Sequence, residues 1–293
     1  MMSDELPSSP PLQARRSFLR ASTTAVAAAA TGALGYAWGI EPHWLETVRR
    51  DMPLVGLPQR WQGRTVLQLS DLHIGAADDD YIESAIETAA ALRPDVIVVT
   101  GDFMSYFGPQ QYDQVPRLLR GLGTPPHGLF GSFGNHDYGE FWSYVEVADA
   151  LAKQLADIDL RVLRNEILEL DGLRLTGIED MWCPEFRRDN VLGALKGSET
   201  GPTICLCHNP DACDLPIWNN YRGWILSGHT HGGQCKPPFL PAPIVPVRNR
   251  RYSQGEVALQ PGRTLYVSRG VGYARRIRFN VRPEITLFTL TAA

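Results

Sequence analysis

The sequence predicts an α/β protein with mixed β-sheets, and two patterns indicate it. An apolar run at 65–70 is followed by helical spacing of apolar residues at 80–92 and then by another apolar run at 95–100, which is the order of a parallel crossover unit. Two alternating segments flank Asp171 and Gly172, a pair that favours a type I′ turn and therefore an antiparallel hairpin. Further strands are expected at 129–133, 202–207 and 223–227, and further helices near 112–122 and 141–156.

Composition sets the size and class of the protein. The 293 residues are 44% hydrophobic and 20% charged, which suits one globular domain with an N-terminal appendage and excludes a disordered or polytopic membrane chain. A formal net charge of −4 gives no general basic surface, so a nucleic-acid partner is not expected. The five cysteines form no C-x-x-C pair, which argues against a zinc ribbon or a thioredoxin-type motif.

The first forty residues differ from the rest. Paired arginines in the stretch 14–20 precede an uncharged, alanine-rich run at 21–40, and together they resemble a twin-arginine export signal. We therefore expect residues 1–40 to engage the twin-arginine export machinery and to place the protein in the periplasm or the envelope. Cleavage and retention as a membrane anchor are both open, since the run is about long enough to span a bilayer. Residues 41–63, broken by three prolines, are interpreted as a connector to the main domain at 64–293.

Five polar clusters are the candidates for chemistry. Four of them directly follow a predicted strand, and residues past the carboxyl ends of strands converge on one crevice in open α/β sheets. Five of the seven histidines lie in these clusters, whereas His43 and His127 are interpreted as core or surface residues. The clusters are Asp71-Leu72-His73, Gly101-Asp102, Gly134-Asn135-His136-Asp137, His208-Asn209-Pro210 and Gly228-His229-Thr230-His231-Gly232-Gly233.

These side chains are suited to metal binding. Imidazole and carboxylate without thiolate favour Mn, Fe, Zn or a similar divalent ion in a catalytic site. Their number exceeds what one ion needs, and two ions sharing a carboxylate, about 3.5 to 4 Å apart, suit in-line displacement at phosphorus. The negative charges of two aspartates only partly neutralise two divalent ions, so the site keeps a net positive charge that attracts phosphate.

The ordered motifs D-x-H, G-D, G-N-H-D, H and G-H-x-H resemble the calcineurin-like metallophosphoesterase superfamily over about residues 64–290. The resemblance implies a four-layer sandwich of two mixed β-sheets flanked by α-helices and two divalent metal ions of undetermined identity. It implies His136 as the catalytic histidine, Asp137 as the residue that orients it, and a metal-bridging hydroxide as the nucleophile. The implied ligands are Asp71, His73, Asp102 and His231 for one ion and Asp102, Asn135, His208 and His229 for the other.

The flanking residues resemble a bacterial branch with an N-terminal signal or anchor, which includes phosphodiesterases and enzymes similar to UDP-2,3-diacylglucosamine hydrolase. A phosphodiesterase acting on a small or lipid-like phosphate ester is the leading hypothesis. The alternatives are a pyrophosphate hydrolase with a nucleotide-linked or lipid-like substrate and a non-catalytic metal-binding scaffold. A nucleic-acid enzyme is a minority hypothesis, based on nine arginines against one acid between Arg248 and Arg282.

Three features have two interpretations each. Arg269 either contacts substrate phosphate or pairs with Glu179 or Asp180. The proline-rich apolar segment 236–247 either folds over the core, which we favour, or forms a rim for a lipid substrate or a membrane surface. The aromatic residues near the expected crevice, Trp142 and Trp182 among them, are interpreted as packing residues rather than as a base-stacking site.

Overall fold

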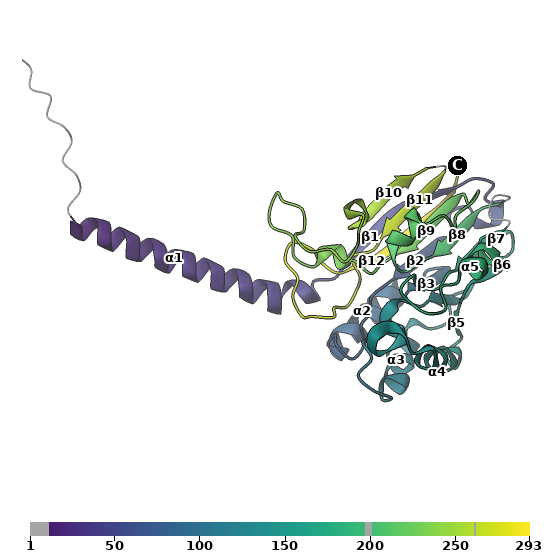
Figure 1. Cartoon of the computed structure of the whole chain (residues 1–293), viewed down its shortest axis with the longest axis horizontal. Helices are drawn as coiled ribbons and strands as arrows, with labels where there is room; N and C mark the ends of the chain where they lie inside the picture. The colour runs from purple at the N-terminus through teal and green to yellow at the C-terminus, as the bar shows by residue number, and fades with distance from the viewer. Residues whose placement is uncertain (1–11, 197–200, 261) are drawn as a thin grey trace, which may run out of the picture.

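The computed structural model describes residues 12–196, 201–260 and 262–293, so residues 1–11 of the expected signal lie outside the described part. Two six-stranded sheets form the body of the protein (Figure 1). The strands are β1 (Glu46–Leu54), β2 (Thr65–Leu69), β3 (Val96–Thr100), β4 (Leu129–Ser132), β5 (Leu160–Val162), β6 (Glu166–Leu170), β7 (Leu173–Gly177), β8 (Thr203–Leu206), β9 (Gly223–Ser227), β10 (Gly255–Leu259), β11 (Arg263–Val267) and β12 (Glu284–Ala292). The helices are α1 (Leu12–Gly39), α2 (Asp79–Ala91), α3 (Gln111–Leu119), α4 (Val145–Ala156) and α5 (Arg188–Ala194).

Both sheets are mixed, as the sequence predicts. The first has the order β1-β12-β2-β3-β4-β5, in which only β12 and β2 run antiparallel. The second has the order β10-β11-β9-β8-β7-β6, with antiparallel pairs at its two edges. The predicted hairpin joins β6 to β7, and both turn residues have positive φ, 49° at Asp171 and 88° at Gly172, as a type I′ turn requires.

The two sheets pack face to face on an apolar layer. Alternation along a strand sends neighbouring side chains to opposite faces, so Val66 and Val98 meet the second sheet, while Leu67 and Ile97 face the helices. From the second sheet, Leu206, Trp224 and other large residues complete the central layer. Helices α2, α3 and α4 cover the first sheet, and α5 lies against the second (Figure 1). This arrangement is the expected four-layer sandwich.

The structure corrects the interpretation of residues 41–63 as a connector. Strand β1 lies within that stretch and pairs in parallel with β12 over nine residues, at the edge of the first sheet. Pro53 has no backbone N–H group. It is tolerated because one side of an edge strand pairs with no neighbouring strand and so needs no N–H donor. Strands β5, β10 and β12 were likewise not expected.

Helix α1 extends away from the body of the protein (Figure 1). Its carboxyl end is fixed to the loop that precedes β12, where Arg278 N–H donates to the Ala37 carbonyl at 2.9 Å. The Arg276 guanidinium lies over the Trp38 ring, 4.7 Å from its centroid. Among the described residues, α1 included, no helix has the length and hydropathy needed to cross a membrane.

Candidate metal centre

The five polar clusters come together at the carboxyl ends of strands in both sheets, as predicted. Strands β2, β3 and β4 supply Asp71, Asp102 and Asn135, and β8 and β9 precede the histidines of the second sheet. Several of these residues have left-handed backbone conformations, with φ of 52° at Asp71 and 53° at Asp102. Such strain costs about 1–3 kcal/mol per residue and occurs mainly where function requires a particular side-chain direction.

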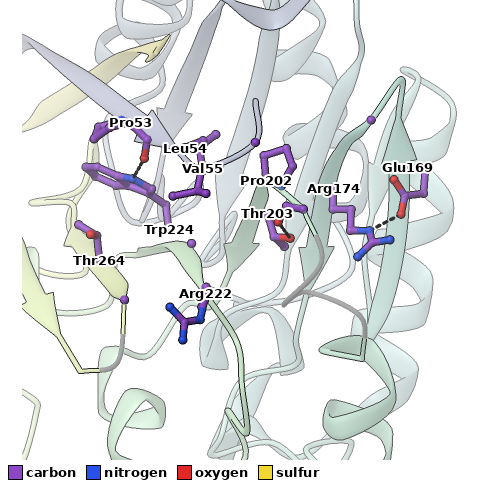
Figure 2. A pocket seen from close by; sticks show the side chains of 15 residues that line it. Pro53, Leu54, Val55, Glu169, Arg174, Pro202, Thr203, Arg222, Trp224 and Thr264 are labelled. Atoms are coloured by element: carbon purple, nitrogen blue, oxygen red, sulfur yellow. Dashed lines mark hydrogen bonds and ion pairs between the residues drawn. The ribbon is translucent and has the colours of Figure 1, made fainter. Parts of the chain in front are cut away.

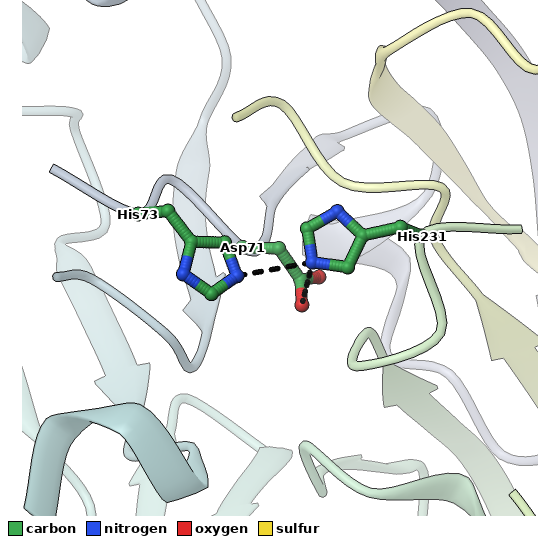
Figure 3. A group of neighbouring side chains, drawn as sticks. All are labelled: Asp71, His73 and His231. Carbon is green, nitrogen blue, oxygen red and sulfur yellow. Dashed lines mark hydrogen bonds and ion pairs between the residues drawn. The ribbon is translucent and has the colours of Figure 1, made fainter. Parts of the chain in front are cut away.

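One group consists of Asp71, His73 and His231, whose ligand atoms lie within 4.8 Å of one another. The Nε2 atoms of the two imidazoles are 3.0 Å apart, and His231 Nε2 is 3.4 Å from Asp71 Oδ1 (Figure 3). All three side chains are buried. The two rings and the carboxylate therefore converge on one point, as ligands of a cation do.

The second group consists of Asp102, His208 and His229, which are buried and equally close together. Asp102 Oδ2 lies 3.2 Å from His208 Nε2 and 3.6 Å from His73 Nε2, so this one oxygen faces a histidine of each group. This is the position that the bridging carboxylate of a two-ion centre occupies.

The histidines are held so that one ring nitrogen of each points inward. His208 Nδ1–H donates to the Thr100 carbonyl at 2.8 Å, and His229 Nε2–H donates to the Pro246 carbonyl at 3.1 Å. Because a carbonyl only accepts, the other nitrogen of each ring faces the site and carries a lone pair for a metal when the ring is neutral. Burial acts to lower the pKa of His208, but Asp102 raises it well above its usual value, so this ring must release a proton when a metal binds. His73 Nδ1 contacts Ser105 Oγ at 2.8 Å, which likewise leaves Nε2 for the site.

Several buried atoms in this region have no hydrogen-bond partner in the described part of the chain, among them Asp71 Oδ2, Asn135 Oδ1 and His208 Nε2. A buried polar atom without a partner costs about 1–3 kcal/mol. The three atoms belong to residues that the sequence assigns as ligands, and oxygen and imidazole donors suit divalent ions. The residues present therefore fit a two-metal centre.

Close packing of backbone supports this arrangement. A Cβ at Gly134 would lie 2.3 Å from Asp102 Oδ1, and one at Gly228 would lie 2.2 Å from Asp71 Oδ2. Neither position has room for a side chain, so glycine is needed where the motif loops pass the two carboxylates.

The pKa values follow from burial and from the neighbouring charges. Burial lowers the pKa of His73 and of His229 to about 3 and raises that of Asp71 to about 6. Burial alone would raise the pKa of Asp102, but His208 and His136 hold it well below its usual range. At neutral pH the inward-facing rings of His73 and His229 are thus uncharged, as metal binding requires.

His136 lies at the edge of the centre and is only partly buried. Its ring packs edge-on against His73, with centroids 4.9 Å apart, and its backbone N–H donates to Asp102 Oδ1 at 2.9 Å. Within the described part of the chain, Asp137 forms no hydrogen bond with the His136 imidazole that it was expected to orient. Its carboxylate accepts the N–H groups of Gly134 at 2.9 Å and Met104 at 3.3 Å, so it fixes the loop backbone rather than the imidazole.

Arg269 also differs from expectation. Its Nε and Nη2 atoms donate to Glu284 at 2.5 Å and to Glu46 at 2.8 Å, on the strands at the edge of the first sheet. Glu179, one of the expected partners, instead binds Arg164 at 2.6 Å. The guanidinium is therefore committed to structural ion pairs, and the phosphate-binding role has no support in this geometry.

Asp180 is a residue of the site that the sequence motifs did not reveal. Its side chain is buried, Oδ1 accepts the Trp182 N–H at 2.8 Å, and Oδ2 has no hydrogen-bond partner in the described residues. Burial raises its pKa to about 6, while the nearby His208 acts to lower it. Asp180 follows β7 closely, so the strand-end pattern that identified the other clusters applies to it as well.

The proline-rich segment 236–247 is exposed at its tip, contrary to the favoured interpretation. Phe239 is 104% exposed and Ile244 is 78% exposed, whereas Ala242 packs at the base of the segment. The chain returns to the metal centre at Pro246, whose carbonyl accepts a hydrogen bond from His229 Nε2. The segment therefore positions a ligand at one end and presents apolar side chains to solvent at the other.

The arginines between Arg248 and Arg282 mostly serve internal contacts. Arg278 is fully buried, and its Nη2 donates to the carbonyls of Arg269 and Gly272 at 2.9 and 2.7 Å. Arg282 pairs with Glu46 at 3.1 Å. These contacts account for much of the basic cluster without a nucleic-acid partner.

A cavity of about 520 Å³ lies elsewhere, at the amino ends of β8, β9 and β11 (Figure 2). Pro53, Leu54, Pro202 and Trp224 line it, together with the starts of these strands. The metal centre is at the opposite ends of the same strands, so this cavity has no part in it.

Comparisons with known proteins agree with this geometry. The family model for calcineurin-like phosphoesterases matches residues 64–233. The chain is 35% identical to the metallophosphoesterase YkuE of Bacillus subtilis, over 94% of this chain and 97% of that protein. It is 29% identical to the phosphodiesterase YaeI of Escherichia coli, over 94% and 98% of the two chains. It is 27% identical to the UDP-2,3-diacylglucosamine pyrophosphatase LpxG of Chlamydia trachomatis, over 92% and 96%.

The family match covers more than half of the chain and includes all the residues assigned above as metal ligands. The buried aspartates and histidines could hold the metal ions with which enzymes of this kind hydrolyse phosphate esters. The chain belongs to the calcineurin-like phosphoesterase family and is a metal-dependent phosphoric ester hydrolase.

Proposed function

We propose that the protein is a phosphodiesterase with two divalent metal ions. The observation that carries the proposal is the position of Asp102, whose Oδ2 faces His73 of one ligand group and His208 of the other. Similarity to the phosphodiesterase YaeI over nearly the whole of both chains supports a diester as substrate.

The residues that would hold the ions fall into two sets. Asp71, His73 and His231 would hold one ion, His208, His229 and Asn135 would hold the other, and Asp102 would bind both. Two such ions supply positive charge for the phosphate and lower the pKa of coordinated water. With two aspartates in the set, the loaded centre has a net positive charge, which favours an anionic diester.

The remaining residues act through position. The His136 ring lies beside His73 at the rim, where it can hold a phosphoryl oxygen or give a proton to the leaving oxygen. Asp137 fixes the loop that carries His136 by accepting two backbone N–H groups. Such preorganisation keeps the imidazole in place without a structural change during turnover.

A second candidate is hydrolysis of a pyrophosphate bond in a nucleotide-linked or lipid-like substrate. Similarity to LpxG over 92% of this chain favours it. The same centre would suit either reaction, because both are displacements at phosphorus in which two bound ions would stabilise the charged oxygens.

Turnover of small substrates separates these candidates. The chelated protein is reloaded with Mn²⁺ and given bis-p-nitrophenyl phosphate, p-nitrophenyl phosphate or UDP-N-acetylglucosamine. The proposal predicts the highest kcat/KM with the diester. Preference for the nucleotide-linked pyrophosphate would favour the second candidate, and two bound metals without turnover of any substrate would favour a scaffold.

We also propose export by the twin-arginine route, on the basis of the arginine pair and the uncharged run that follows it at 21–40. Fusion of residues 1–45 to a reporter tests this, with Arg15→Lys and Arg16→Lys together as the defective control. Export of the fusion that is lost in the control is expected. Equal export of both would refute the proposal.

A membrane surface is a further proposed partner, supported by the exposed tip of segment 236–247. Apolar side chains that protrude beside basic residues favour contact with an anionic bilayer. Replacing Phe239, Leu240 and Ile244 with aspartate is expected to reduce sedimentation of the full chain with phosphatidylglycerol vesicles. The matched control is Val55→Asp, which changes an exposed apolar residue at the opposite end of the sheets.

A further inference from the structure

Two tryptophans that are distant in sequence stack on one another at the rim of the metal centre. The rings of Trp142 and Trp182 have centroids 5.0 Å apart and an interplanar angle of 18°. Trp182 packs against the ligand His229 at 4.5 Å, and Trp142 packs against His136 at 6.0 Å. The pair therefore spans the site from a metal ligand to the catalytic histidine.

The pair is formed by loops from both sheets. Trp142 is on the loop that follows β4, and Trp182 is on the loop that follows β7. The Trp182 loop is fixed by Asp180, whose Oδ1 accepts the Trp182 N–H and whose carbonyl accepts the Cys183 N–H at 3.0 Å.

The Trp142 loop is held in a strained conformation. Phe141 and Trp142 both have left-handed backbone conformations, with φ of 57° and 56°. Two consecutive bulky residues with positive φ are uncommon and occur where the surrounding structure enforces a particular side-chain direction. Here that direction brings the Trp142 ring against Trp182 and His136, as the ring contacts show.

Both rings remain partly open to solvent although they are stacked. Trp142 is 36% exposed and Trp182 is 39% exposed. Phe141, the residue before Trp142, is 77% exposed, and Phe107, on the loop after β3, is 68% exposed. Exposed apolar side chains gathered at a catalytic rim indicate a binding surface rather than a core.

We propose that the Trp142–Trp182 pair is the subsite for a flat ring, such as a nucleobase, carried by one ester group of the substrate. The inference rests on the proposed phosphodiesterase function and specifies its substrate class. An indole face favours a planar ring by stacking, a contribution that corresponds to about 5- to 150-fold in affinity per base. A nucleoside phosphodiester places its base one sugar away from the phosphate, so the base reaches the rim when the phosphate is at the centre.

Two substrates with the same leaving group test the subsite. They are the p-nitrophenyl ester of thymidine 5′-phosphate and methyl p-nitrophenyl phosphate, which differ only in the retained group. The proposal predicts that kcat/KM of the metal-loaded full chain is at least about tenfold higher with the thymidine ester. In Trp142→Ala and Trp182→Ala the ratio of the two kcat/KM values falls towards one. Both rates are measured on the same variant, so a general loss of activity cancels from the ratio.

Three variants complete the design. Trp142→Leu keeps an apolar side chain but no stacking face, so it also loses the preference, and it replaces Trp142→Ala if that protein does not fold. Trp142→Phe keeps part of the preference. Trp38→Ala, which removes an exposed tryptophan of α1, leaves both rates unchanged.

Equal rates with the two esters in the unaltered protein would overturn the proposal, as would a preference that survives in both alanine variants. A higher kcat/KM with hexyl p-nitrophenyl phosphate than with the thymidine ester would assign the rim to an alkyl chain and would overturn it too. If neither ester is hydrolysed, the phosphodiesterase function fails. The subsite is then judged by equilibrium dialysis of thymidine 5′-monophosphate, whose dissociation constant must rise in Trp142→Ala for the proposal to stand.

Discussion

The Nε2 atoms of His73 and His231 lie 3.0 Å apart in the interior of the protein. Burial lowers the pKa of His73 to about 3 and that of His231 well below its usual value, so neither ring is charged at neutral pH. Two neutral imidazoles share at most one hydrogen bond, and Asp71 Oδ1 is 3.4 Å from the same His231 nitrogen. A cation between these three side chains explains why they converge.

Asp102→Asn is expected to weaken both metal sites together. Asp102 Oδ2 faces His73 and His208, one from each ligand group, and an amide oxygen lacks the charge that binds two ions. Metal analysis of the purified variant after dialysis checks this. Loss of a single ion from the variant would show that Asp102 is not the bridge.

His136→Ala should leave two metals bound and reduce kcat by about 10²- to 10⁴-fold, the usual contribution of a positioned acid–base group. The His136 ring packs against His73 and also lies close to Asp102, but the groups formed by Asp71, His73 and His231 and by Asp102, His208 and His229 do not include it. Turnover of bis-p-nitrophenyl phosphate and metal content are measured on the same sample. Undiminished kcat would remove His136 from the mechanism.

Asp71→Asn is expected to stabilise the metal-free protein at about pH 8 while it weakens metal binding. Burial raises the pKa of Asp71 from 3.8 to about 6, so its contribution to stability is present below pH 3.8 and is lost as pH rises through 6. Removing the buried charge should add up to about 3 kcal/mol to the free energy of unfolding at pH 8, the amount that corresponds to a pKa raised from 3.8 to about 6. Urea unfolding in chelator at about pH 4 and pH 8 checks the sign. A benefit that is larger at the lower pH, or equal in the exposed control Asp51→Asn, would contradict it.

Arg278→Lys is expected to lower the free energy of unfolding by about 3 kcal/mol. Lysine cannot donate all the hydrogen bonds that the buried guanidinium donates to backbone carbonyls. Arg278 Nη2 donates to the carbonyls of Arg269, Gly270 and Gly272, which precede β12. Unfolding of the metal-loaded protein in urea measures the loss. The exposed Arg222→Lys is the control, and equal stability of the two variants would assign Arg278 no structural role.

Much of the fold was predictable because local patterns coincide with tertiary structure in its central strands. The apolar runs that become β2 and β3 are buried on both faces, and Asp171-Gly172 specifies its turn locally. Strand β1 was missed because it is half-exposed, contains Pro53, and is specified by pairing with β12 at the other end of the chain. Helix α4 begins at Val145 rather than near 141 because Phe141 and Trp142 have left-handed backbone conformations.

The ligand residues were predictable because they follow strand ends and bear donor atoms in ordered motifs. Contacts between distant segments were not predictable from spacing. Examples are the hydrogen bond between His229 Nε2 and the Pro246 carbonyl and the stacking of Trp142 on Trp182. The partners of Arg269, Glu46 and Glu284, were missed for the same reason, since they lie on β1 and β12, two strands that were not expected.

The most direct test of the two-metal centre is a titration of the chelated full chain with Mn²⁺, in which bound metal and hydrolysis of bis-p-nitrophenyl phosphate are followed together. A two-metal centre predicts binding that saturates at two ions per chain, with activity that rises as the second ion binds. Saturation at one ion with full activity, or hydrolysis that persists in the chelated protein, would contradict it.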